Sequence, residues 1–578
     1  MCGIVGYLGN NLKKESFEQA RDTSTHRGPD DFGAYFNKKN KVALGHRRLS
    51  IIDLSSQGRQ PMQTPDGRFI IVYNGEIYNY IEIKSELKDY YDFTTKTDTE
   101  VILASYMKWG ERCLEKFNGM FAFAIYDSQE NTLFCARDRL GIKPFYYYLQ
   151  GKTLMFASEI KSLLALGVKA EPNGLMIYDY LASGYYDHTN ETFFKGIYKL
   201  PAGCFAKYNR GELKIKNYWD LASIQDKYNY SRSNQKQLEE KLRELMSDSI
   251  RLQFRSDVPV GITLSSGLDS MSLLYFSEKV THKKMHIFSS CLPDKKYDEC
   301  KFIKNFLTAD QKQTWHTAYL KPKEVFPLIQ NMLGIQDEPY GGISTIMYSI
   351  LYNLTPRANV KVLLEGQGGD ELLAGYPYYR EDQPRNGLSQ DLTREICPEV
   401  LNDDFLNVYK NKKTDAPKKP FRSPLLNAQY RDIKYTKLPR VLRFNDRISM
   451  AASRELRVPY LDHRIVEYCF FLPRKYKLTA ETSKKILRDA MSPFIPYVVK
   501  HKPKVVFGAV QPHWFRKYLK DEILDILHSQ TFRDRPYWDH EKTMGKAKLF
   551  FAGEGENSFF IWQWIILEMW LRKYIDRA

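Results

Sequence analysis

The sequence predicts a two-domain protein that combines α+β and α/β architecture. Its 578 residues are enough for two or more domains. Up to about residue 210, short β-rich runs separated by turn residues recur, as in packed antiparallel sheets. From about residue 235, strand and helix patterns alternate, which is typical of a parallel sheet covered by helices, and the chain is helical after about residue 440. We therefore expect domains at residues 1–210 and 235–578, joined by a polar linker.

The bulk composition is that of an ordinary water-soluble protein, with 43% hydrophobic and 27% charged residues. The net charge is +17, but Lys and Arg are spread along the chain without a basic arm, which argues against a nucleic-acid partner. No signal peptide opens the chain, and the apolar segment 559–571 is shorter than the ~20 residues that span a bilayer. The eight cysteines form neither a CxxC pair nor a disulfide framework. We expect a cytoplasmic protein with no membrane partner.

The predicted elements follow from local patterns. In the first domain, β-rich runs and one helical pattern occupy residues 69–73, 121–126, 133–137, 144–148 and, for the helix, 99–109. In the second domain, a helix, a buried strand and further strands and helices occupy residues 237–251, 258–264, 286–291, 298–307 and 361–364. We find no internal repeat.

Cys2 is the first candidate for chemistry. Removal of Met1 would make Cys2 the N-terminal residue, and its amine, with an ordinary pKa of about 7.7–8.0, could then act as base for its own thiol. The alternative is a buried cysteine that only packs. Position alone does not decide between the two interpretations.

Three downstream segments supply the other parts of a glutamine site. Arg48 can hold an α-carboxylate by a two-point contact. Glu76 and Asp98 can hold an α-ammonium, and Asn74 with the backbone N–H of Gly75 can form an oxyanion hole. Each segment alone has a structural explanation, such as a surface arginine, an Asn-Gly turn or a helix N-cap. Their occurrence together with Cys2 favours hydrolysis of glutamine.

These segments resemble a known family. MCGIVGY, HRGPD, GHRRLSIID, NGEIYN, TDTE and the ARD and GIKP segments at 136–138 and 141–144 look like the class II glutaminase domain of glutamine-dependent asparagine synthetases. The resemblance covers nearly all of the first 200 residues. It implies an N-terminal-nucleophile hydrolase fold, an αββα sandwich, in which Cys2 attacks the glutamine amide and releases ammonia.

The first strand of the second domain runs into a turn of small residues and then into a helix. Such a turn directs backbone N–H groups and a helix N-terminus toward one anion. A carboxylate inside the turn suggests a bridging Mg²⁺. The predicted ATP-binding residues of this turn are Leu264, Ser265, Ser266, Gly267, Asp269 and Ser270. The turn resembles the pyrophosphate-binding loop of the ATP pyrophosphatases, with Ser266 in place of the middle glycine.

A second glycine-rich loop follows the predicted strand 361–364. Gly366 and Gly368 let the backbone approach a ligand closely, and Asp370 can share a cation with Asp269. The segment LEGQGGDE resembles the second loop of asparagine synthetases, and the resemblance extends over most of residues 240–470. It implies ATP and Mg²⁺ as cofactors, with Asp269 and Asp370 as metal ligands.

Some positions depart from the family pattern. Gln367 stands where some members carry a glutamate with an acid–base role, and residues 341–345 differ from many asparagine-forming members. The basic loop at residues 502–507 also differs, and Lys504 is the residue there that we expect to meet pyrophosphate. The stretch 377–440 looks more like asparagine-synthetase-like proteins of polysaccharide gene clusters.

The resemblance implies one amidotransferase with two active sites. A carboxylate acceptor attacks the α-phosphorus of ATP, and ammonia then attacks the acyl-adenylate, releasing AMP. We expect a protected passage for ammonia, with the strands at 121–126 and 144–148 as candidates for its lining. The default acceptor is L-aspartate, and the alternative is the carboxylate of a uronic acid. A non-catalytic binding protein and a standalone glutaminase stay open as other classes, and family members are often homodimers.

Overall fold

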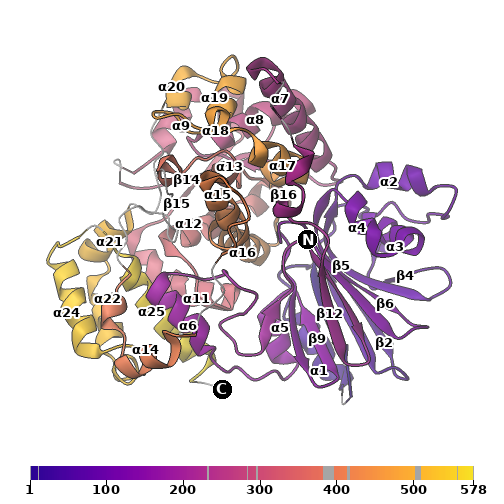
Figure 1. The fold of residues 1–578 in the computed structure, drawn as a ribbon, viewed down its shortest axis with the longest axis horizontal. Coiled ribbons are helices and arrows are strands. Elements are labelled where there is room, and N and C mark those ends of the chain that lie inside the picture. The colour runs from indigo at the N-terminus through magenta and orange to yellow at the C-terminus, as the bar shows by residue number, and fades with distance from the viewer. Residues whose placement is uncertain are drawn as a thin grey trace.

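The computed structural model describes residues 2–10, 12–228, 230, 233–282, 284–294, 297–381, 396–412, 417–501, 510–555 and 557–576. The predicted pyrophosphate contact Lys504 lies outside these residues. Figure 1 shows the sheets of the N-terminal part on one side of the molecule and the helix-rich C-terminal part on the other.

The N-terminal part contains two six-stranded antiparallel sheets. The first has the order β10-β8-β9-β1-β3-β2. Its strands are β1 (Gly3–Leu8), β2 (Asp31–Asn37), β3 (Val42–Arg48), β8 (Tyr146–Gln150), β9 (Thr153–Ala157) and β10 (Ile197–Lys199). The second has the order β12-β11-β7-β6-β5-β4. Its strands are β4 (Met62–Gln63), β5 (Phe69–Ile77), β6 (Gly119–Asp127), β7 (Thr132–Arg137), β11 (Cys204–Asn209) and β12 (Glu212–Asn217).

Strand alternation sorts the side chains of these sheets into layers. Ile4 of β1 and Val72 of β5 lie in the core between the two sheets. Tyr73 and its same-face neighbours pack against helices α2 (Tyr80–Leu87) and α3 (Asp98–Trp109). Val5 faces the other way, toward α1 (Lys14–Asp22) and α5 (Ile160–Ala165). The layers are therefore helix, sheet, sheet and helix, which confirms the predicted sandwich.

The C-terminal part contains a five-stranded parallel sheet with the order β15-β14-β13-β16-β17. Its strands are β13 (Val260–Thr263), β14 (Ile287–Cys291), β15 (Trp315–Tyr319), β16 (Val362–Leu364) and β17 (Glu455–Arg457). Because β13 and β16 are neighbours and parallel, the loops that follow them lie side by side at one edge of the sheet. This arrangement confirms the predicted α/β class.

Helices surround this sheet and form the rest of the C-terminal part. Those nearest the sheet are α7 (Gln235–Gln253), α8 (Leu268–Thr281), α9 (Cys300–Phe306), α10 (Ala309–Gln313), α11 (Val325–Gln336), α12 (Gly342–Tyr352), α13 (Gly369–Leu372), α15 (Pro424–Lys434), α16 (Lys437–Ala451), α17 (His463–Phe471), α18 (Arg474–Lys477), α19 (Lys485–Met491) and α20 (Tyr497–His501). A further group is α14 (Asp403–Tyr409), α21 (Gln511–Lys517), α22 (Lys520–His528), α23 (Gln530–Arg533), α24 (His540–Phe551) and α25 (Phe559–Tyr574). Among the described helices, none has the length and apolar character needed to cross a membrane.

Helix α6 (Gly174–Ser183) belongs to the N-terminal sequence but lies with the C-terminal helices, beside α14 and α25 in Figure 1. Its buried side chains share one hydrophobic core with α25, and Gln563 of α25 donates a hydrogen bond to the backbone oxygen of Tyr180. The two parts of the chain are therefore joined by a continuous core as well as by the linker.

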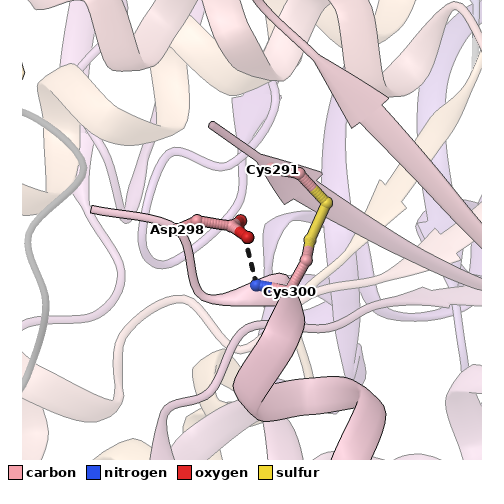
Figure 2. Close-up of side chains that lie close together, drawn as sticks. All are labelled: Cys291, Asp298 and Cys300. Atoms are coloured by element: carbon pink, nitrogen blue, oxygen red, sulfur yellow. Dashed lines mark hydrogen bonds between the residues drawn. A yellow bond between two sulfur atoms is a disulfide. The ribbon is translucent and has the colours of Figure 1, made fainter. Parts of the chain in front are cut away.

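Cys291, at the end of β14, forms a disulfide with Cys300, at the start of α9. Their Cα atoms lie 5.5 Å apart, and a carboxylate oxygen of Asp298 accepts a hydrogen bond from the Cys300 backbone N–H at 3.1 Å (Figure 2). The cysteine spacing did not predict this disulfide. The turn between β14 and α9 brings them together, whereas the other cysteines of the described chain are buried and form no disulfide.

Candidate active sites

Cys2 directly precedes β1, and its backbone is held at both ends. Its backbone N–H donates to Oδ1 of Asn74 at 2.9 Å, and its backbone oxygen accepts from Nε of Arg27 at 3.0 Å. Burial raises the pKa of the Cys2 thiol, while the amino terminus, the Leu49 backbone and Arg48 act to lower it. The Cys2 backbone is therefore held in place, and the amino terminus and Arg48 supply positive charge near its thiol.

Asn74 has an amide nitrogen without a partner. The residue is fully buried near the end of β5, and its Nδ2 has no hydrogen-bond acceptor among the described residues. An unpaired buried donor is costly, so its persistence points to a ligand atom that would accept the bond. Asn74 therefore holds Cys2 with its side-chain oxygen and leaves its side-chain nitrogen available to donate to a ligand.

Gly75 follows directly and tolerates no side chain. Its φ is 157°, and a Cβ placed on it would lie 2.1 Å from the backbone oxygen of Met120. The neighbouring strand β6 therefore approaches Gly75 too closely for any other residue.

We expect Gly75→Ala to lower glutamine hydrolysis by about 10²-fold, because moving this backbone displaces a predicted oxyanion donor. Glutamate release from glutamine measures the effect. Gly110→Ala is the control, since a Cβ on Gly110 meets nothing within 4 Å although its φ is also positive. Equal losses in both variants would contradict the interpretation.

Arg48, Glu76 and Asp98 gather around this cysteine. Arg48 is buried and donates to backbone oxygens of the following loop, including that of Ser55 at 2.7 Å. Oδ2 of Asp98 accepts from the Tyr73 hydroxyl at 2.7 Å and from the Ile77 N–H at 2.8 Å. Burial raises the pKa of Asp98 to about 6. All five predicted residues, Cys2, Arg48, Asn74, Glu76 and Asp98, thus belong to one buried cluster with Gly75 beside them.

The C-terminal part completes this cluster with residues that sequence reasoning missed. Nη2 of Arg457 lies 3.6 Å from Oε1 of Glu76, and Nε of Arg457 donates to Oε1 of Glu455 at 2.6 Å. Burial, with the nearby carboxylates of Glu455 and Asp98, raises the pKa of Glu76. Both residues come from β17, some 380 positions along the chain from Glu76, so no local pattern could have placed them there.

Arg27 was also missed as a site residue. Besides holding Cys2, its Nη1 donates to Oε1 of Glu159 at 2.8 Å and to Oδ2 of Asp446 at 2.8 Å. The available signal was the glycine in the segment HRGPD. A Cβ on Gly28 would lie 2.3 Å from the Arg47 backbone carbon, so the chain packs closely there. This close packing sets Arg27 against β3.

The first predicted nucleotide loop connects β13 to α8. Its small residues bond mainly to one another: Ser270 Oγ accepts from the Ser265 N–H at 3.1 Å, and Ser265 Oγ accepts from the Gly267 N–H at 3.2 Å. The Ser266 N–H donates to Oε2 of Glu299 at 3.1 Å. Leu264 is buried at the end of the strand. The loop is thus a compact turn at a helix N-terminus, as predicted.

The second loop packs directly on the first. A Cβ on Gly366 would lie 3.4 Å from the backbone nitrogen of Ser270, and one on Gly369 would lie 2.8 Å from Cγ of Asp269. Gly368 has φ 95°, and a Cβ there would lie 2.2 Å from the side chain of Leu461. Gly368 and Gly369 are required because the two loops and the segment before α17 meet here.

Lys484 lies between the two predicted metal ligands. Its Nζ contacts Oδ2 of Asp269 and lies 2.6 Å from Oδ1 of Asp370. The two carboxylates raise the pKa of the Lys484 ammonium, although its burial opposes them. Lys484 has φ 53°, an unusual backbone for a lysine. Sequence reasoning missed Lys484; the pair Lys484-Lys485 before a helix was its only signal.

Glu365 lies one residue before the second loop and is a buried carboxyl. The Tyr352 hydroxyl donates to it at 3.2 Å and Nδ2 of Asn445 at 3.0 Å, and the Gln367 side chain also bonds to it. Burial raises the pKa of Glu365 to about 7, above its ordinary value of 4.5.

This carboxyl predicts a pH dependence of stability. Between pH 4.5 and 7 the folded state keeps a proton that the unfolded carboxyl has released, so the free energy of unfolding should fall as pH rises through this window. The change amounts to about 3 kcal/mol, and Glu365→Gln should remove it. Urea midpoints at several pH values check this, with the exposed Glu541→Gln as control. An unchanged slope in Glu365→Gln would contradict it.

An apolar cluster joins the two parts of the chain between these sites. It includes Leu49, Ile52, Tyr78 and Met120 from the N-terminal part, and Leu252, Val362 and Met450 from the C-terminal part. The strands proposed for the ammonia passage lie elsewhere. Residues 121–126 fill the two cores of the sandwich, and Pro144 and Tyr146 line a cavity of about 90 Å³ between the parts, whose lining includes neither Cys2 nor Asp269.

Comparison with known proteins identifies the family. A family model described as a glutamine amidotransferase domain matches residues 1–219, and one described as asparagine synthase matches residues 241–572, more than half of the chain. The chain belongs to the asparagine synthetase family. The resemblance inferred from the sequence is thereby confirmed.

Relatives match this family member along nearly its whole length. Asparagine synthetase [glutamine-hydrolyzing] 3 of Bacillus subtilis is 30% identical, covering 93% of both chains. Asparagine synthetase [glutamine-hydrolyzing] 1 of the same organism is 29% identical, covering 99% of this chain and 96% of the relative. Amidase chry2 of Gibberella zeae is 26% identical, covering 94% of both. The asparagine synthetase family comprises glutamine-hydrolysing ligases that use glutamine, ATP and a carboxylate acceptor, and this chain is such a ligase.

Proposed function

We propose that the protein transfers ammonia from glutamine to an adenylated carboxylate, with L-aspartate as the default acceptor and L-asparagine as product. Residues 1–210 would hydrolyse glutamine, and residues 235–578 would activate the acceptor. The observation that carries the proposal is the presence of two built sites in one chain: Cys2 held by Asn74, and Asp269 beside Asp370 on adjacent loops.

The glutaminase half-reaction follows from the cluster around Cys2. With Met1 removed, the free amine of Cys2 would take the thiol proton, and the thiolate would attack the glutamine amide. Nδ2 of Asn74, which lacks a partner, and the Gly75 N–H would stabilise the oxyanion. Arg48 would bind the α-carboxylate of glutamine, and Glu76 and Asp98 its α-ammonium. This attack would release ammonia and leave a glutamyl thioester on Cys2, which water would then hydrolyse.

The two nucleotide loops fit Mg²⁺. Asp269 and Asp370 both reach one ammonium group, so they are close enough to share one cation, and carboxylates are ligands that Mg²⁺ prefers. When bound, Mg²⁺ would neutralise charge on the phosphates. We assign the turn from Leu264 to Ser270, with Gly366 and Gly368, to ATP. Lys484 would remain beside the phosphates as a fixed positive charge, with Lys504 as a further proposed contact.

The acceptor carboxylate would attack the α-phosphorus of ATP, forming an acyl-adenylate and pyrophosphate. This step converts a carboxylate oxygen, which is a poor leaving group, into part of AMP, which leaves readily. Ammonia would reach the adenylate uncharged, and the apolar cluster of Leu49, Ile52, Met120, Val362 and Met450 would exclude water from its path. Attack on the carbonyl would then release AMP and form the amide.

The acceptor decides between two versions of this function. The default is L-aspartate, and the carboxylate of a uronic acid is our alternative. Purified enzyme with glutamine and ATP should release AMP and pyrophosphate when given either L-aspartate or a nucleotide-linked uronic acid. Release of ADP would overturn both versions, and the acceptor that is consumed identifies the right one.

A further inference from the structure

Helix α16 contacts both active sites through consecutive residues. Asp446 accepts hydrogen bonds from Nη1 and Nη2 of Arg27 at 2.8 and 3.2 Å, and Arg27 in turn holds the backbone oxygen of Cys2 at 3.0 Å. The preceding residue, Asn445, donates to Glu365 at 3.0 Å. One short chain of contacts therefore runs from the nucleophile to the start of the second nucleotide loop.

The geometry of the helix makes this connection stiff. Successive residues of an α-helix point about 100° apart, so neighbours can serve different sites while moving as one body. Every side chain in the connection is buried: Arg27 is 0% exposed, Glu365 3%, Asp446 5% and Asn445 7%. Arg447, the next residue, lies 2.9 Å from Oε1 of Glu159, which also binds Arg27.

The connection ends on backbone that a nucleotide would touch. Glu365 precedes Gly366, on which a Cβ would lie 3.4 Å from both the Asp269 side chain and the Ser270 backbone nitrogen of the first loop. At the other end, separating Asp446 from Arg27 would break a buried ion pair, which is costly. A shift of the loops at Glu365 is therefore more readily followed by the whole helix than absorbed at the Arg27 end.

We infer that α16 couples the two active sites, with Asn445 and Asp446 as positioning residues that relay occupancy of the nucleotide loops to Cys2. The inference rests on the proposed function. Binding of ATP·Mg²⁺ then raises kcat/KM for glutamine hydrolysis. To the extent that it tightens glutamine binding, glutamine tightens nucleotide binding by the same factor, because coupling between binding free energies is reciprocal. Glutamine is thus consumed chiefly when the acceptor can be activated.

The test uses the full chain and ATP·Mg²⁺ as probe. Glutamate release is measured with and without the probe, in the wild type and in the variants Asp446→Asn and Asn445→Ala. We expect kcat/KM for glutamine hydrolysis to be at least about five times higher with ATP·Mg²⁺ than without it in the wild type. In both variants this ratio should be near one. Asn445→Ala should keep its basal hydrolysis. Asp248→Asn removes a carboxylate that pairs with Arg251 and Arg464 instead, and should keep the wild-type ratio.

The outcomes separate the inference from the function on which it rests. AMP formation with ammonium and thermal unfolding show whether each variant is folded and able to activate the acceptor. A wild-type ratio near one, or a ratio retained in both folded variants, overturns the coupling role of α16. Absence of both glutamine hydrolysis and AMP formation in the wild type overturns the proposed function itself. If Asp446→Asn fails to fold, Asn445→Ala decides alone.

Discussion

Replacing Cys2 by alanine is expected to abolish glutamine-dependent amide formation while leaving ammonium-dependent formation intact. The thiol is the group that would attack glutamine, and removal of a nucleophile costs about 10⁴-fold or more. Ammonium supplied in the medium does not need the thiol, so acceptor activation on the other loops should continue. Parallel assays of AMP release, with glutamine or with ammonium chloride, measure the difference.

Cys204→Ala supplies the control for this experiment. Cys204 is also a buried cysteine of the N-terminal sheets, but its thiol packs in the core between the sheets and donates a weak hydrogen bond of 3.9 Å to Oδ1 of Asn217. Its loss should leave both assays within about two-fold. Glutamine-dependent activity in Cys2→Ala would contradict the role that we give to the amino-terminal residue.

The second large effect is expected at Lys484. Lys484→Met should lower AMP formation by about 10³-fold with either nitrogen source, because the fixed positive charge beside Asp269, Asp370 and the proposed phosphate site is lost. Hydrolysis of glutamine without ATP should persist, since Lys484 does not belong to the Cys2 cluster. Pyrophosphate release measures the first activity and glutamate release the second.

Lys485→Met is a closely matched control. Lys485 is the adjacent residue, yet it pairs with Asp489 one turn along α19 and touches neither nucleotide loop. We expect less than a three-fold change. If the two variants behave alike, the effect of Lys484 comes from the helix and not from its contacts with Asp269 and Asp370.

Local sequence patterns predicted the parts of each site that lie on one strand or loop. Asn74, Gly75 and Glu76 follow one another on β5, and the turn from Leu264 to Ser270 is a single segment. Strand periodicity and turn composition are short-range signals, so such groups are readable without a structure.

Contacts between distant segments could not be predicted in this way. Lys484 reaches Asp269 across 215 positions, and Asp446 reaches Arg27 across 419. These side chains meet because the parallel sheet and α16 bring their elements together. The local sequence around a single lysine or aspartate does not indicate which distant residue it pairs with. The expected ammonia passage stays a prediction, because short-range patterns do not distinguish the apolar strands of a domain core from apolar residues at an interface.

The position of α6 has a practical consequence for dissecting this protein. Cutting the gene after residue 210 would leave the apolar side chains of Met176, Ile177, Tyr180 and Leu181 without the C-terminal helices that now cover them. A fragment with such a bare surface is prone to aggregate, and the complementary fragment would carry an empty groove. Each half-reaction is better silenced by a point substitution in the intact polypeptide than studied in a truncated one.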